Sequence, residues 1–97
     1  MLDTGSGNAA RHTVLLVEDE AATRDYLAGA IDRHPALHVL AACADIAAAR
    51  AIVQVSLPDV LLTDLALPDG DGVTLIREIK QAAPACECMV ISVFGTE

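Results

Sequence analysis

The sequence predicts an α/β fold with three layers, in which helices cover both faces of a doubly wound parallel sheet. Short apolar runs alternate with longer segments of helical periodicity along its 97 residues. Strands that alternate with helices of this length are typical of right-handed crossovers and therefore of parallel strands. The run TVLLV at residues 13–17 is almost continuously apolar, as expected for a strand that is buried on both faces.

Four strands are expected, at residues 13–18, 37–42, 59–63 and 88–93. The first helix is predicted at residues 21–33, because Leu27, Ala30 and Ile31 recur at the spacing of one helical face. Pro35 ends this helix, since proline disfavours helical geometry in the residue before it.

The second and third helices are predicted from their flanking residues. Asp45 is an expected N-cap of the second helix. A turn-rich loop at residues 65–72 precedes the third helix, and within it Asp69 and Asp71 are expected to be turn and cap residues. Pro84 closes the third helix.

The composition limits the classes of function. Hydrophobic residues make up 54% of the chain, which is enough for a core, and the formal net charge is -8. This charge argues against binding of nucleic acid or anionic membrane by this segment. Residues 1–12 are expected to be a polar leader without the apolar centre of a signal peptide, and a cytoplasmic location is expected. Three cysteines match no zinc-binding spacing.

Acidic residues follow the first and third predicted strands. Glu18 and Asp19 end the first strand, and Asp64 ends the third. Ligands of open α/β sheets bind beyond the carboxyl ends of the strands, and in the flavodoxin-like order 2-1-3-4 the first and third strands are neighbours. Carboxylates that crowd together favour either a shared proton or a cation. Mg²⁺ is typically held by one or two carboxylates with water and phosphate oxygens, so a magnesium site is predicted here.

Three motifs in one register resemble the receiver domains of two-component response regulators. They are VLLVEDE at residues 14–20, DVLLTDLALPDGDG at residues 59–72, and MVISV at residues 89–93. Each motif alone is weak, but the three in this order are specific. The segment LALPDGDG at residues 65–72 is most similar to that of receivers fused to a helix-turn-helix DNA-binding output module.

The resemblance implies a role for each matching residue. Asp64 would accept a phosphoryl group from a sensor histidine kinase, and Ser92 would be the hydroxyl that reports its arrival. Asp19 and Asp64 would bind Mg²⁺ directly, Glu18 would act through water, and the backbone carbonyl of Ala66 would complete the site. Such a receiver is a phosphoacceptor that assists its own chemistry, not a turnover enzyme, and it would switch a transcriptional output.

The sequence departs from the family pattern after the fourth strand. Receivers carry a lysine at the end of a fifth strand, whereas the single lysine here, Lys80, lies late in the third helix. The receiver is therefore expected to span residues 13–97 and to lack the last helix–strand–helix portion. The free edge of the fourth strand, residues 88–94, is expected to mediate self-association.

Other functions would need residues that this sequence lacks at the corresponding positions. A flavin or dinucleotide module would need a glycine-rich or hydroxyl-rich phosphate loop where EDEAAT stands. A Mg²⁺-dependent phosphatase would need a general acid at Ala66, and an EF-hand would need an oxygen ligand at Val73. A degenerate receiver that serves only as a dimerisation module stays open. The three histidines are assigned to leader and loop positions without chemistry.

Overall fold

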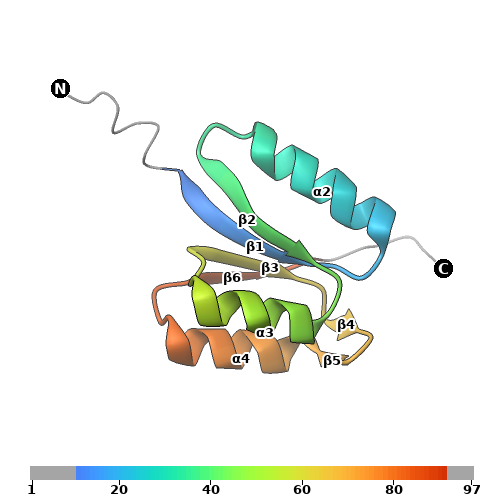
Figure 1. Ribbon diagram of the computed structural model, residues 1–97, viewed down its shortest axis with the longest axis vertical. Helices are drawn as coiled ribbons and strands as arrows, with labels where there is room; N and C mark the ends of the chain where they lie inside the picture. Colours follow the sequence, from blue (N-terminus) through green and yellow to red (C-terminus); the bar gives the residue numbers. More distant parts are fainter. Residues whose placement is uncertain (1–10, 92–97) are drawn as a thin grey trace.

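A computed structural model describes residues 11–91, which form a four-stranded parallel sheet with the order β2-β1-β3-β6. The strands are β1 (His12–Val17), β2 (Leu37–Cys43), β3 (Val60–Thr63) and β6 (Glu87–Val90). Figure 1 shows α2 (Ala21–Arg33) on one face of this sheet, and α3 (Ile46–Val55) and α4 (Gly72–Ala82) on the other. The predicted three-layer architecture and the predicted strand order are therefore confirmed.

The core lies mainly between the sheet and the pair α3 and α4. Successive strand residues point to opposite faces, and one alternate set packs with the inner faces of these helices. This cluster contains Leu15, Val17, Cys43, Ile46, Ala49, Leu61, Leu67, Leu75, Ile79 and Cys86. Full burial of each leucine in it contributes about 1.5–3 kcal/mol to folding. None of the residues in this cluster is aromatic, in agreement with the low aromatic content of the sequence.

The ends of the strands differ from the prediction by one residue or a few. β1 begins at His12, one residue before its predicted start, so the assignment of His12 to the polar leader was wrong: its backbone pairs with Leu37 of β2. His38 lies in β2, in agreement with the strand predicted at residues 37–42, and only its description as a loop histidine was wrong. β6 begins one residue early, at Glu87, and the predicted end of this strand at residue 93 lies outside the described residues.

The segment after β3 is more regular than the expected loop. It forms a small antiparallel hairpin of β4 (Ala66–Leu67) and β5 (Gly70–Asp71). Gly70 adopts a φ of 152°, a conformation that side chains with a Cβ rarely adopt. Gly72 lies against the backbone, because a Cβ added there would come within 2.2 Å of the Asp64 carbonyl oxygen. The hairpin thus returns directly over the end of β3.

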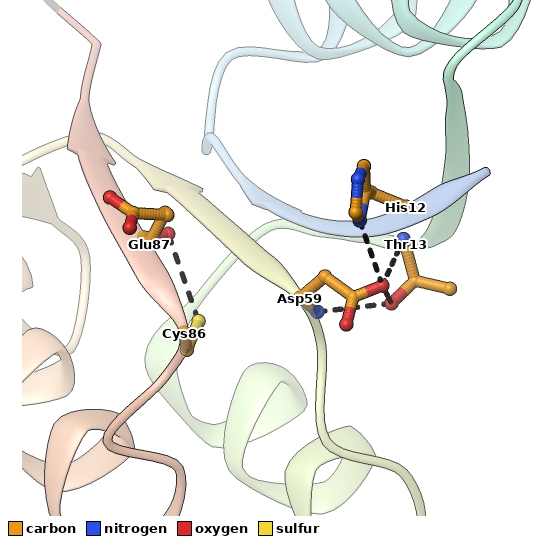
Figure 2. Close-up of polar contacts among 5 residues, drawn as sticks. All are labelled: His12, Thr13, Asp59, Cys86 and Glu87. Carbon is orange, nitrogen blue, oxygen red and sulfur yellow. Dashed lines mark hydrogen bonds and ion pairs between the residues drawn. The ribbon is translucent and has the colours of Figure 1, made fainter. Parts of the chain in front are cut away.

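A polar clasp joins the starts of β1 and β3. Figure 2 shows His12 and Thr13 both in contact with the Asp59 carboxylate. The backbone N–H of Thr13 donates to Asp59 Oδ2 at 2.9 Å, and the backbone N–H of Asp59 donates to Thr13 Oγ1 at 3.0 Å. His12 Nδ1 lies 3.8 Å from the same carboxylate. These reciprocal bonds set the register of the two strands at the end of the sheet opposite the acidic residues.

The helices of the described region are short. Within residues 11–91 none has the length and hydropathy that a membrane-spanning helix requires.

Candidate functional site

The register of β1 against β3 brings the acidic residues together. Val17 pairs with Thr63, so the residues that follow each of them leave the sheet side by side. The backbone N–H of Asp64 donates to the Val17 carbonyl at 3.0 Å, and the N–H of Glu18 donates to the Cys43 carbonyl at 2.9 Å. Backbone hydrogen bonds therefore fix the positions of the Cα atoms of Glu18 and Asp64.

Three carboxylates form the candidate metal centre. Glu18, Asp19 and Asp64 each offer an oxygen atom, and these three atoms lie within 4.8 Å of one another. Glu18 is only 3% exposed, Asp64 is half-buried and Asp19 is exposed. An all-oxygen donor set that is open to water on one side suits a hard dication such as Mg²⁺. The structure thus brings together the three residues that the sequence predicted to share one edge.

The electrostatics of Glu18 agree with a site for a cation. Burial raises the pKa of Glu18 above its ordinary value, and the charges of Asp64 and Asp19 raise it further. The backbone N–H of Glu20, which donates to Glu18 Oε2 at 3.0 Å, opposes this shift. A buried carboxyl beside two other carboxylates is costly to ionise unless a positive charge enters.

Glu20 does not belong to this cluster. Its carboxylate caps α2 by accepting from the backbone N–H of Thr23 at 2.9 Å. Hydrogen bonds from the Thr23 hydroxyl and N–H lower the pKa of Glu20. The acidic run after β1 therefore divides into two site residues and one helix cap.

Arg24 supports the strand end from α2. Its guanidinium donates to the Glu18 carbonyl at 2.9 Å and to the Asp19 carbonyl at 3.4 Å. These bonds hold the backbone of both acidic residues without neutralising their carboxylates directly. Arg24 was missed at the sequence level, because one arginine in a helix carries no pattern that points to a strand end.

The remaining predicted site residues fall in different places. Ala66 lies on β4, and its backbone N–H approaches Asp64 Oδ1 at 3.4 Å, so this residue adjoins the cluster. Ser92 lies outside the described residues, and its role stays a prediction. Lys80 is exposed, as expected, and its ammonium donates to the carbonyls of Pro84 at 3.2 Å and Cys86 at 2.8 Å. Lys80 therefore serves the end of α4 that is remote from the acidic residues.

Asp69 was predicted only as a turn residue, but it makes a contact across the chain. Its carboxylate accepts from the backbone N–H groups of Ile46 and Ala47, at 2.9 and 3.0 Å. Asp71 caps α4, as predicted, by accepting from the N–H of Val73.

The sequence and the fold match known proteins. The family model described as response regulator receiver domain matches residues 14–97. The chain is 45% identical over 71 residues to a protein-glutamate methylesterase/protein-glutamine glutaminase of group 3 operon from Cereibacter sphaeroides, a match that covers 73% of this chain and 19% of that protein. It is 31% identical over 84 residues to the DNA-binding transcriptional activator DevR/DosR from Mycobacterium tuberculosis, which covers 87% of this chain and 39% of that protein. The chain thus spans well under half the length of these curated relatives.

Solved structures show the same fold. A two-component response regulator of the LuxR family from Aurantimonas sp. SI85-9A1 superposes with a TM-score of 0.77 at 27% identity, covering 88% of this chain and 61% of that one. The non-phosphorylated receiver domain of the stress response regulator RcsB from Escherichia coli superposes with a TM-score of 0.76 at 24% identity, covering 89% of this chain and 68% of that one. The second likeness concerns the fold alone.

Proposed function

This chain belongs to the family of response regulator receiver domains, and from that premise we propose that Asp64 is its phosphoacceptor. The donor is the phosphohistidine of a sensor histidine kinase. The observation that carries the proposal is the meeting of Glu18, Asp19 and Asp64 within 4.8 Å at the carboxyl edge of the sheet. A half-buried Asp64 is sheltered by the fold and still open to a donor.

The chemistry is a transfer of one phosphoryl group. An oxygen of the Asp64 carboxylate attacks phosphorus, the P–N bond to the donor imidazole breaks, and its electron pair stays on that nitrogen. The new P–O bond makes an acyl phosphate on Asp64, as with other carboxylate nucleophiles. The 3.4 Å contact from the Ala66 N–H to Asp64 Oδ1 orients the carboxylate for this attack.

Mg²⁺ is the proposed cofactor. Asp19 and Asp64 would bind it directly, Glu18 would act through water, and the Ala66 carbonyl would complete the protein ligands. When bound, the ion neutralises charge on the transferred phosphoryl oxygens. The buried Glu18 supports this assignment, because burial and the neighbouring carboxylates raise its pKa, and a nearby cation would offset that cost of ionisation.

The output is proposed to be transcriptional and to belong to another part of the protein. One relative is named as a DNA-binding transcriptional activator, and one structural neighbour is of the LuxR family. The methylesterase from Cereibacter sphaeroides is matched over only 19% of its length, so that activity is not carried over to this segment. A net charge of -8 argues against direct contact of this segment with nucleic acid. A cytoplasmic location follows from the proposed kinase partner.

The edge of β6 favours a second candidate function, that of an interaction module. Within residues 11–91, β6 pairs with β3 on one side alone. Met89 is 57% exposed and Val90 is 44% exposed on this strand. Exposed strand edges are templates for pairing with another chain, so this edge would mediate self-association even where phosphorylation fails.

Treatment with acetyl phosphate and Mg²⁺, followed by intact-mass measurement, tests the phosphoacceptor proposal. We expect one added phosphoryl group, sensitive to hydroxylamine, and none on Asp64→Asn. Asp25→Asn is a matched control, because it removes an exposed carboxylate of α2 outside the cluster. A phosphoryl group that still adds to Asp64→Asn would overturn the assignment. A chain that self-associates in sedimentation but never gains mass would favour the interaction module.

A further inference from the structure

We infer that Asp69 is a positioning residue for the acidic site, acting by fastening the β4–β5 hairpin to α3. This inference rests on the proposed function, because the hairpin carries Ala66, the proposed source of a backbone ligand. The Asp69 carboxylate bonds to the backbone of α3, and it acts on Asp64 through the backbone of the hairpin.

Both carboxylate oxygens of Asp69 accept a hydrogen bond from the backbone of α3. Oδ1 accepts from the Ile46 N–H at 2.9 Å, and Oδ2 accepts from the Ala47 N–H at 3.0 Å. These are N–H groups of the first turn of α3, which have no partner inside the helix. Each oxygen thus satisfies a separate donor, and both bonds join segments more than 20 residues apart.

The hairpin needs such a support. A two-stranded ribbon is marginal on its own, and each of these strands has only two residues. At its base, the Gly72 N–H donates to the Leu65 carbonyl at 2.8 Å, and buried Leu67 joins the core. At its tip, Gly70 packs so closely on Ile46 that an added Cβ would lie 2.9 Å from the Ile46 Cδ1 atom. Asp69 supplies the polar half of this contact at the tip.

Loss of the Asp69 bonds should therefore reach the site through the hairpin. Ala66 is paired with Asp71 across the hairpin, and its N–H contacts Asp64 Oδ1. A hairpin released from α3 would let Ala66 move relative to Asp64. Glu18 and Asp19 would keep their places, because their backbone is held by β2 and by α2.

Asp45 provides a matched control. Its carboxylate caps the same helix by accepting from the Ala48 N–H at 2.8 Å, a bond that stays within α3 and its cap. Asp45→Ala therefore weakens the first turn of α3 and removes one negative charge, as Asp69→Ala does. The two variants differ in whether the hairpin loses its attachment.

The test is a Mg²⁺ titration of the full chain, followed by amide NMR, for the unaltered protein, Asp69→Ala, Asp69→Asn and Asp45→Ala. Groups that orient metal ligands typically contribute on the order of tenfold in metal affinity, so we expect Asp69→Ala to weaken Mg²⁺ binding by at least about threefold. The Mg²⁺ affinity of Asp69→Asn should lie between those of the unaltered chain and Asp69→Ala, because the asparagine amide keeps one acceptor oxygen. Asp45→Ala should bind Mg²⁺ as the unaltered chain does. Equal affinities in all four proteins, or equal losses in both alanine variants, would overturn the inference.

Amide hydrogen exchange without metal separates this inference from the proposed function. We expect Asp69→Ala to speed exchange at Leu67 and Gly70 of the hairpin, and Asp45→Ala to speed it only in α3. Unchanged exchange in the hairpin of Asp69→Ala would show that the carboxylate does not hold the loop. If the unaltered chain bound no Mg²⁺, the metal site of the proposed function would fail, and the exchange rates would still decide whether Asp69 fastens the hairpin.

Discussion

Removal of the Asp64 charge should stabilise the metal-free chain. The three cluster oxygens lie within 4.8 Å of one another, so Asp64 repels both Glu18 and Asp19 when all are ionised. At 4.8 Å, each pair of unit charges costs about 0.9 kcal/mol in a medium like water and about 3.5 kcal/mol at an effective dielectric of 20. Because Asp19 is exposed and Asp64 half-buried, the lower value is the better guide. The two pairs together then amount to about 1–2 kcal/mol.

This gain should be visible in thermal unfolding. For a domain of this size, 1 kcal/mol shifts Tm by about 4–8 °C. We therefore expect Asp64→Asn to unfold at least about 4 °C above the unaltered chain in EDTA and low salt. The asparagine keeps an oxygen that can accept from the Ala66 N–H, so the local hydrogen bond is preserved. Added salt should reduce the difference, since it screens exposed charges.

Mg²⁺ should reduce or reverse the difference in Tm between Asp64→Asn and the unaltered chain. A ligand at ten times its Kd stabilises the native state by about 1.4 kcal/mol, and the unaltered chain keeps all three carboxylates for it. Asp64→Asn lacks one of these carboxylates, so Mg²⁺ should stabilise it less. Circular dichroism melts with EDTA and with increasing Mg²⁺ measure both effects, with Asp25→Asn as the charge-matched control. An Asp64→Asn variant that melts like the control in EDTA, and rises as much as the unaltered chain with Mg²⁺, would refute a shared site.

Three further predictions concern other parts of the molecule. The raised pKa of Glu18 means that the folded state holds its proton to higher pH than the unfolded state, so metal-free stability should fall as pH rises above the ordinary value of 4.5. Glu18→Gln should remove this part of the slope in pH-dependent denaturant melts, and an unchanged slope would contradict it. Gly72→Ala forces a Cβ against the backbone, 2.2 Å from a carbonyl oxygen, and should cost about 1–3 kcal/mol or more. At Gly29 an added Cβ would meet only the flexible end of an arginine side chain, so Gly29→Ala should raise the free energy of unfolding by about 0.5–1 kcal/mol in chemical denaturation. A change of the same sign in both variants would refute the steric argument. Burial raises the pKa of the Cys86 thiol to about 11, so iodoacetamide should label the half-buried Cys88 first at pH 8. Faster labelling of Cys86, mapped by mass spectrometry, would contradict this order.

Local patterns were sufficient to predict the sheet and the meeting of the three carboxylates. The apolar runs identified the strands, and the acidic residues after two of them identified the shared edge, because the ends of parallel neighbours meet. Asp45 and Asp71 were recognisable as caps, since an N-cap bonds within three residues of itself.

Contacts between distant segments were not predictable in this way. Asp69 was seen only as a turn residue because its partner, Ile46, lies 23 residues earlier. The β4–β5 hairpin lies where the sequence predicts a loop, because strands of two residues show no alternation of apolar and polar residues. Arg24 was overlooked because its bonds go to backbone carbonyls, which any sequence supplies.

The parallel order of the sheet has a consequence for charge beyond the acidic side chains. Every helix that follows a parallel strand starts at the carboxyl edge, and α2, α3 and α4 all do so. The first turn of a helix carries the positive end of its macrodipole, equivalent to roughly half an elementary charge. The positive ends of three helix dipoles thus point toward the edge of the sheet where the carboxylates lie. The capping carboxylates of Glu20, Asp45 and Asp71 offset part of this positive potential. Under the proposed function, an anionic phosphodonor that approaches Asp64 would meet a local potential less negative than the net charge of -8 alone would produce.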